Sequence, residues 1–140
     1  MRQILLFAAL AASLALLSGC ALSKAKADTA EDMSDKAAYQ KISAEEAYEM
    51  MASQEVMVVD VRTREEYDGG HIENAVLVPN ESIGSEMPEV LPDKEATLLV
   101  YCRSGRRSKD AAEKLLALGY QSVYNFGGVI DWPYELVKEG

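Results

Sequence analysis

Short apolar segments alternate with amphipathic segments along the chain from Tyr39 to the C-terminus. The segments 56–61 and 97–102 are nearly continuous runs of apolar side chains, as strands buried on both faces of a sheet are. Segments with helical periodicity or helix-capping signals lie between such runs. Strands that alternate with helices in this way favour an α/β fold with a parallel sheet.

Two sequence patterns mark the starts of helices. Ser43 is followed by Glu46, and Thr63 is followed by Glu66. This spacing is typical of a capping box, in which the two side chains satisfy backbone amides at a helix start. The first helix would bury one face, made of Ala47, Met50 and Met51.

The other boundaries follow from apolar runs and glycines. Gly69 and Gly70 should end the second helix, and a third helix is predicted over 108–118 with Gly119 just past its end. The segment from 81 to 93 is expected to be irregular, and a helical stretch holding Trp132 is expected at the C-terminus. The predicted strands are 56–61, 75–78, 97–102 and 122–126.

Length and composition limit the class of protein. The chain has 140 residues, of which 49% are hydrophobic and 26% charged, as in a single globular domain. Disulfide-stapled miniproteins, collagenous chains and multi-domain enzymes are therefore excluded. The formal charge is −9, and it becomes −10 if Arg2 is removed with a signal (−9 − 1). So acidic a chain is not expected to bind nucleic acid.

Residues 1–19 have the pattern of a secretory signal peptide. Arg2 supplies a positive charge, and the apolar run 4–17 is shorter than the roughly 20 residues that span a bilayer. The sequence Leu17-Ser-Gly-Cys20 resembles the lipobox of bacterial lipoproteins, in which the cysteine is acylated and the chain is cut before it. The alternative is an ordinary signal peptide followed by a chance cysteine.

The lipobox interpretation predicts an exported protein, anchored to a bacterial membrane through acylated Cys20, with its domain facing the periplasm or the cell exterior. Residues 20–38 contain few large apolar side chains, and we interpret them as the lipidated N-terminus and a flexible tether. An Ala-rich helix is the alternative for the tether. Residues 39–140 then form one folded domain.

Cys102 is the strongest candidate for a reactive residue. It ends the predicted strand 97–102 and is followed directly by the predicted helix, a position where α/β sheets bind ligands. Backbone amides of such a turn and the start of the helix stabilise an anion. Gly105 can take a positive φ there. The turn also carries three arginines, Arg103, Arg106 and Arg107. These features predict a Cys102 thiol with a lowered pKa.

Other interpretations of the polar residues remain open. Cys102 could be a small buried core residue, although three nearby cations argue against this. His71 is the only histidine, and a structural role is favoured for it over a Cys–His pair. Arg62 is expected to form an ion pair with Glu65 or Glu66. Asp60 could line the pocket or cap the following turn.

In order along the chain, several motifs resemble those of the single-domain rhodanese sulfurtransferases. These are Asp60-Val-Arg62, Glu65-Glu-Tyr67, Gly70-His-Ile72, Pro79, Tyr101 to Ser108, Leu118-Gly-Tyr120, and Gly127-Gly128 to Trp132. The resemblance implies a three-layer α/β/α domain around a five-stranded parallel sheet. It also implies that Cys102 carries a persulfide in a six-residue loop that ends at Arg107. Glu73-Asn74 departs from the usual Pro-Gly at one turn.

This resemblance implies a sulfurtransferase that moves sulfane sulfur from thiosulfate, or a similar small anionic donor, to a thiol or cyanide. The expected substrate-binding residues are Arg103, Ser104, Gly105, Arg106, Arg107 and Ser108. We expect no cofactor, no metal and a monomer. One alternative is a membrane-tethered sulfur carrier or binding module with little turnover.

A second alternative is phosphatase or arsenate reductase chemistry on the same fold. Phosphatases with a cysteine nucleophile have a Cys-x5-Arg pattern, whereas here Arg107 follows Cys102 with four residues between them and Ser108 stands at the next position. The loop also lacks an Asp or Glu that could act as a general acid. The spacing therefore favours sulfur transfer.

Overall fold

The structure is a computed structural model that describes residues 38–139. The predicted signal peptide, the lipidated Cys20 and the tether up to residue 37 lie outside the described residues. Within the described part, no helix has the length and apolar character needed to cross a membrane.

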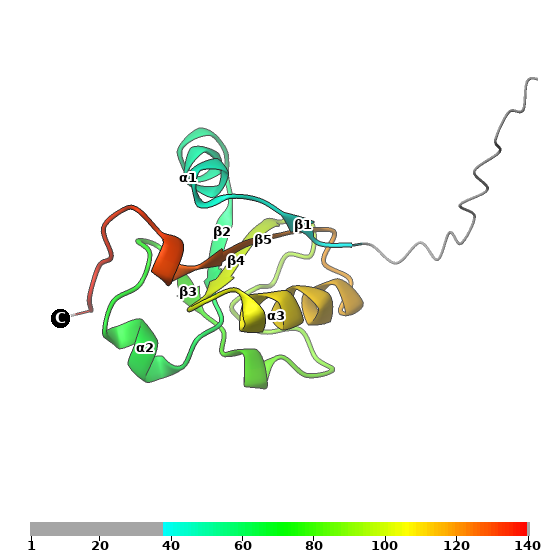
Figure 1. Ribbon diagram of the computed structural model, residues 1–140. Coiled ribbons are helices and arrows are strands. Elements are labelled where there is room, and N and C mark those ends of the chain that lie inside the picture. Colours follow the sequence, from blue (N-terminus) through cyan, green and yellow to red (C-terminus); the bar gives the residue numbers. More distant parts are fainter. Residues whose placement is uncertain (1–37, 140) are drawn as a thin grey trace, which may run out of the picture. The chain divides into compact units, whose positions relative to one another are not determined.

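A parallel sheet of five strands forms the centre of the domain, as the sequence predicts (Figure 1). Its spatial order is β1-β5-β4-β2-β3. The strands are β1 (Gln40–Lys41), β2 (Met57–Asp60), β3 (Val76–Leu77), β4 (Thr97–Cys102) and β5 (Ser122–Gly128). The longest strands, β4 and β5, lie next to each other, so Cys102 ends a strand in the middle of the sheet.

Helices cover both faces of this sheet (Figure 1). They are α1 (Ala44–Ser53), α2 (Arg64–Asp68) and α3 (Arg106–Ala117), with short 3₁₀ turns η1 (Asn80–Ser82) and η2 (Val129–Asp131). Alternate residues of β4 point to opposite faces. Leu99 and Tyr101 pack in the cluster that includes residues of α1 and α2, whereas Leu98, Val100 and Cys102 pack in the cluster that includes α3.

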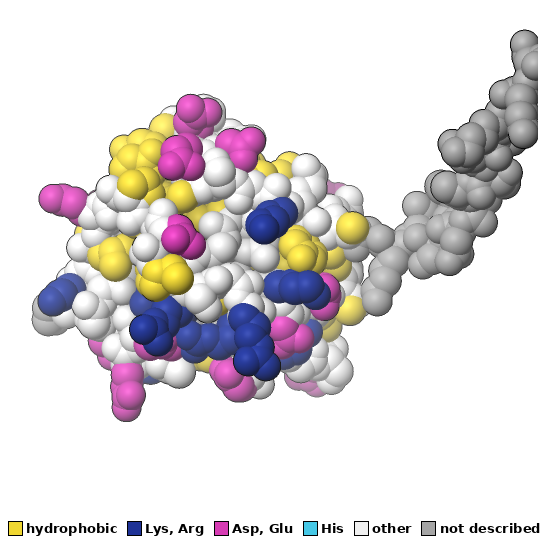
Figure 2. All heavy atoms as spheres, in the orientation of Figure 1, with side chains coloured by type: hydrophobic (Ala, Val, Ile, Leu, Met, Phe, Trp, Pro, Cys, Tyr) yellow, Lys and Arg dark blue, Asp and Glu magenta, His cyan; other side chains and the backbone are white. Residues whose placement is uncertain are grey.

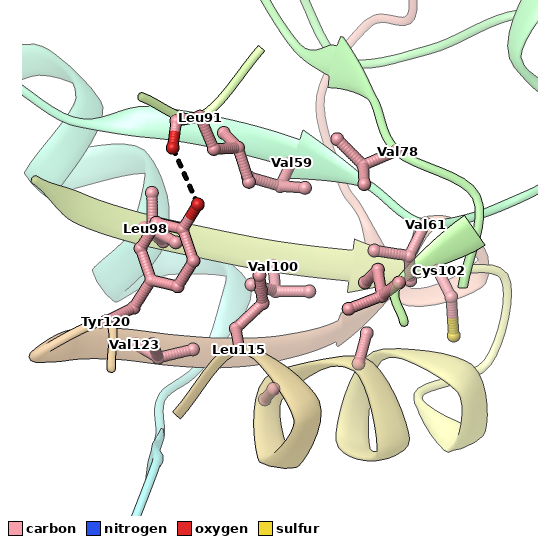
Figure 3. Close-up of a cluster of buried hydrophobic side chains, with 13 residues drawn as sticks. Val59, Val61, Val78, Leu91, Leu98, Val100, Cys102, Leu115, Tyr120 and Val123 are labelled. Atoms are coloured by element: carbon pink, nitrogen blue, oxygen red, sulfur yellow. Dashed lines mark hydrogen bonds between the residues drawn. The ribbon is translucent and has the colours of Figure 1, made fainter. Parts of the chain in front are cut away.

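The core beneath α3 positions the end of β4. Ala111, Ala112 and Leu115 of α3 are fully buried against the sheet, in the cluster drawn in Figure 3. The Tyr120 hydroxyl donates a hydrogen bond of 2.6 Å to the Leu91 carbonyl at the far end of the cluster. This packing fixes the axis of α3, so that its first turn meets the end of β4.

Both predicted capping boxes are confirmed. The side chain of Ser43 accepts from the Glu46 amide, and Thr63 does the same for Glu66. The third helix begins at Arg106, two residues earlier than predicted, because Gly105 acts as its N-cap at φ 98°. Asn74 has a φ of 63°, a left-handed conformation that Asn tolerates better than most residues.

The prediction of a C-terminal helical stretch is wrong. Strand β5 continues through both glycines to Gly128, and only the 3₁₀ turn η2 follows it. Trp132 lies after this turn in an extended conformation (φ −80°, ψ 113°). Because Pro133 comes next, the α conformation is disfavoured at Trp132.

Candidate active site

Cys102 lies at the junction between β4 and α3. In Figure 3 its sulfur points toward the first turn of α3. The backbone amide of Gly105 donates a hydrogen bond of 3.0 Å to Sγ. No side chain caps α3, in contrast to α1 and α2, so the sulfur stands where a capping oxygen would otherwise be.

Hydrogen bonds stabilise the thiolate form of Cys102. Burial raises the pKa of this thiol, because the residue is only 1% exposed. Hydrogen bonds from the Ser108 side chain and from the amides of Ser108, Gly105 and Ser104 outweigh burial, and the pKa lies below its ordinary value. Cys102 is thus a core residue by its packing and an activated thiol by its hydrogen bonds.

Ser108 belongs to a buried polar network. Its hydroxyl has three acceptors in reach: the Asn125 Oδ1 at 2.9 Å, the Gly105 carbonyl at 3.0 Å and the Gly127 carbonyl at 3.2 Å. The Gly127 amide donates to the same Oδ1 of Asn125. Asn125 was not among the sequence candidates, although a polar residue inside an apolar strand was a signal that could have identified it.

Gly128 allows the end of β5 to touch the loop. A Cβ built on Gly128 would lie 2.0 Å from the Arg103 carbonyl oxygen and 2.5 Å from the Ser104 amide nitrogen. The β4–β5 register also shifts between Val100 and Cys102, so that Cys102 pairs with Gly128. Only glycine permits this close backbone contact.

The three arginines of the loop have different surroundings. Arg103 and Arg106 are exposed, and neither lies within salt-bridge distance of a carboxylate in residues 38–139. Arg107 instead donates two hydrogen bonds to Glu66 of α2, at 2.7 and 2.8 Å. Two of the three guanidinium groups are therefore available to an anion, and the third ties the loop to α2.

The surface around the loop is basic in an otherwise acidic domain. Figure 2 shows Lys and Arg side chains gathered over the start of α3 and toward α2. Residues 38–139 contain 10 Lys and Arg against 19 Asp and Glu, which again gives −9 (10 − 19). Segment 103–109 has four basic residues and no acidic one. This contrast favours the approach of anions to Cys102.

Asp60 caps the turn after β2 and does not open onto the site. It is fully buried, and its Oδ1 accepts from the Arg62 amide at 2.9 Å. The Arg62 guanidinium and the Tyr101 hydroxyl also donate to its carboxylate. Burial and the nearby Asp60 raise the pKa of Tyr101.

The expected ion pair of Arg62 with Glu65 or Glu66 is therefore wrong. The side chain of Arg62 turns back to Asp60, two residues earlier, and to the Gly70 carbonyl at 2.7 Å. Glu66 is engaged by Arg107, whose hydrogen bonds lower the pKa of this carboxyl to about 2.

His71 lies in a structural position. It is 4% exposed, its ring stacks on Tyr67 with centroids 3.6 Å apart, and its Nδ1 lies 2.9 Å from the Tyr67 carbonyl oxygen. Its backbone pairs with Val137. Among residues 38–139, no group of three His, Cys, Asp or Glu side chains is placed to hold a metal ion.

A family model for the rhodanese-like domain matches residues 43–133. This range contains the sheet from β2 to β5, Cys102 and the whole loop. The chain belongs to the rhodanese-like domain family. A rhodanese-like domain supports sulfurtransferase-type chemistry, which agrees with an activated thiol beside free arginines.

Solved structures agree with this family. A rhodanese-like domain protein from Staphylococcus aureus is 32% identical and superimposes with a TM-score of 0.62, over 72% of this chain and 99% of that protein. A human single-domain sulfurtransferase is 28% identical, with a TM-score of 0.60, over 66% of this chain and 93% of its own.

Curated relatives are longer proteins. The tRNA uridine(34) hydroxylase of Photorhabdus laumondii is 32% identical over 104 residues. The match covers 71% of this chain and 30% of the hydroxylase. The chain thus spans about a third of the length of that relative, and the resemblance concerns the shared domain.

Proposed function

We propose that the protein is a thiosulfate sulfurtransferase that carries sulfur on Cys102 and delivers it to a thiol or to cyanide. One observation carries the proposal: the Cys102 sulfur stands at the uncapped start of α3, 3.0 Å from the Gly105 amide nitrogen, with Arg103 and Arg106 exposed beside it. Cyanide or a thiol would act second, in a ping-pong cycle.

In the first half-reaction, the Cys102 thiolate attacks the outer sulfur of thiosulfate. A bond forms between Sγ and that sulfur, the S–S bond of thiosulfate breaks, and sulfite leaves with the electron pair. No proton moves in this step, so no general base is needed. Arg103 and Arg106 offset the negative charge of the donor and of the departing sulfite.

Arg107 has a different role in this proposal from the one expected for it. Its guanidinium is held by both Glu66 oxygens. We assign it to bracing the loop against α2, with donor recognition left to Arg103 and Arg106.

Phosphate chemistry is the alternative that the loop disfavours. Arg107 closes the loop after four intervening residues, and it is engaged by Glu66. The purified domain should release no phosphate from aryl phosphates. Robust phosphate release that is lost in Cys102→Ser would overturn the assignment.

We also propose that the protein is exported and anchored to a membrane through Cys20, on the basis of the Leu17-Ser-Gly-Cys20 sequence. The native protein should partition with membranes and begin at an acylated Cys20. Cys20→Ser should block processing. A mature N-terminus at another residue would contradict this proposal.

Mass spectrometry of the thiosulfate-treated domain tests the main proposal. Cys102 should gain about 32 Da, the mass of one sulfur atom in a persulfide. Cyanide should remove the added mass and yield thiocyanate over many turnovers, and His71→Ala should retain most of this turnover. Loading without turnover would indicate a sulfur carrier instead of an enzyme. No loading would overturn the proposal.

A further inference from the structure

An open groove runs beside the Cys102 loop. Ser104 and Gly105 form one wall, and the first turn of α1, from Ser43 to Glu45, forms another. In Figure 1 this region lies between β1 and the start of α3. The other lining residues are Tyr39, Lys41, Ile42, Lys109, Asn125, Phe126, Gly127 and Asp131. The groove is thus continuous with the loop that holds the reactive sulfur.

Asn125 presents an unpartnered donor to this groove. The residue is only 6% exposed. Its Oδ1 is fixed by the Gly127 amide at 3.0 Å and by the Ser108 hydroxyl at 2.9 Å. These contacts orient the amide, and its Nδ2 has no acceptor among the described residues. Because buried polar groups normally have hydrogen-bond partners, this NH₂ group points to a ligand with an acceptor atom.

Charges of both signs line the groove. Lys41 has no carboxylate within salt-bridge distance in residues 38–139, and the ten-residue helix α1 starts here with its positive dipole end. Lys109 is occupied by Glu113. Glu45 and Asp131 are exposed carboxylates on the same groove. A ligand that carries one carboxylate and one ammonium group would match this surface.

We propose that the groove binds the sulfur acceptor, and that the acceptor is a small thiol of the cysteine type with a carboxylate and an ammonium group. This inference rests on the proposed sulfur transfer at Cys102. The carboxylate is received by the Asn125 Nδ2 and by Lys41, and the ammonium by Asp131 or Glu45. The thiol then lies toward Ser104 and Gly105, next to the persulfide.

The transfer step balances without any other reactant. The acceptor thiolate attacks the outer sulfur of the protonated Cys102 persulfide. A new S–S bond forms in the acceptor, which leaves as its own persulfide. The S–S bond on Cys102 breaks, and the electron pair returns to Sγ as the thiolate.

Single-turnover discharge of the Cys102 persulfide tests the proposal. Three acceptors with the same thiol arm are compared at equal thiolate concentration: L-cysteine, 3-mercaptopropionate, which lacks the ammonium, and cysteamine, which lacks the carboxylate. The expected order of second-order rate constants is L-cysteine, then 3-mercaptopropionate, then cysteamine. Equal rate constants for the three acceptors would overturn the proposal.

Two variants locate the carboxylate site. Lys41→Gln should lower the rate constant for the two carboxylate acceptors about 3-fold and leave cysteamine unchanged. Asn125→Asp keeps an acceptor for the Gly127 amide but removes the donor, and it should lower the same two rate constants about 10-fold. Lys138→Gln, at an exposed lysine outside the groove, is the matched control. An unchanged preference in Lys41→Gln and Asn125→Asp would overturn the proposal.

The loading step separates this proposal from the proposed function. If thiosulfate fails to load Cys102, the proposed function fails, and polysulfide-loaded protein still tests the groove. A titration with S-methyl-L-cysteine, which cannot accept sulfur, adds a direct readout on the unloaded protein. It should shift the side-chain amide resonances of Asn125 in the NMR spectrum, and no shift at saturating ligand would overturn the proposal.

Discussion

Strands β2 and β4 are neighbours in the sheet, and each ends in a turn that leads to a helix, but the two turns treat their polar groups in opposite ways. After β2, the charges of Asp60 and Arg62 are buried and paired, with side chains 0% and 5% exposed. The helix that follows, α2, is capped by Thr63 and Glu66. Every group in this turn is satisfied by its own segment or by Tyr101 and Gly70.

After β4, the sequence supplies no internal partner. Gly105 has no side chain to cap α3, the loop amides turn toward Cys102, and Arg103 and Arg106 remain open. The comparison shows how one type of connection can serve stability or chemistry. A helix start that is satisfied by its own side chains is inert, whereas one satisfied by a thiolate is poised to react.

The strongest test of this difference is Cys102→Ser. We expect complete loss of sulfur transfer, because a hydroxyl cannot carry the sulfane sulfur. The fold should survive, since serine is close to cysteine in size, and circular dichroism checks this. Sulfur transfer above the uncatalysed rate in a folded Cys102→Ser domain would show that the reactive group lies elsewhere.

Gly128→Ala tests whether the open loop depends on close backbone contact. The added Cβ would lie 2.0 Å from the Arg103 carbonyl oxygen, so the loop or β5 must move. We expect a loss of about 3 kcal/mol in the free energy of unfolding, together with loss of persulfide formation. Urea denaturation and mass spectrometry measure the two effects.

Gly84→Ala is the matched control, since a Cβ there meets no atom within 4 Å. It should change the free energy of unfolding by less than about 0.5 kcal/mol. Equal effects of the two substitutions would remove the argument for a special contact at Gly128.

The Glu66–Arg107 pair joins the two turns, and acid should weaken it. The pKa of Glu66 is lowered from 4.5 to about 2, so its stabilisation is fully present above pH 4.5 and is lost as the pH falls toward 2. Glu66→Gln should cost on the order of 2 kcal/mol at pH 7, after allowance for partial exposure. The difference from the native protein should shrink in acid.

Glu86→Gln serves as control, because Glu86 is exposed and makes no ion pair within residues 38–139. Denaturation curves between pH 2 and pH 7, a range set by the two pKa values above, measure both variants. A pH-independent difference for Glu66→Gln would mean that the carboxylate charge is not what stabilises the contact.

The smallest expected change in stability distinguishes the two hydroxyls near the helix starts. Thr63→Ala should cost about 1 kcal/mol of stability through the lost cap of α2 and leave the pKa of the Cys102 thiol unchanged. Ser108→Ala should raise that pKa, because hydrogen bonds from Ser108 lower it. The pH dependence of iodoacetamide alkylation measures both. A raised pKa in Thr63→Ala would contradict the separation of the two turns.

Local sequence signals predicted the features that depend on neighbouring residues. A capping box is complete within four residues, so Ser43 and Thr63 identified both helix starts. The apolar run 97–102 is strand β4 at its predicted boundaries, because a central strand is buried on both faces. The start of α3 was missed by two residues, since Gly105 carries no capping side chain.

Features that depend on tertiary contacts were not predictable in this way. Arg62 was expected to pair with a nearby glutamate, but its partner is Asp60, and Glu66 binds Arg107 from 41 positions away. Asn125 reaches Ser108 from another strand. No sequence spacing encodes such contacts, because they are set by how β5 and α3 pack on β4.

Trp132 gives the domain an optical reporter at the end of β5. It is the only tryptophan in the chain, and its indole Nε1 is buried without a hydrogen-bond partner among the described residues. The ring packs 5.5 Å from Phe126, which precedes the two glycines of the loop contact, and 4.9 Å from Tyr134. An indole without a polar partner fluoresces at shorter wavelength than a hydrated one. Loosening of this corner should therefore shift the emission to the red and weaken energy transfer from Tyr134.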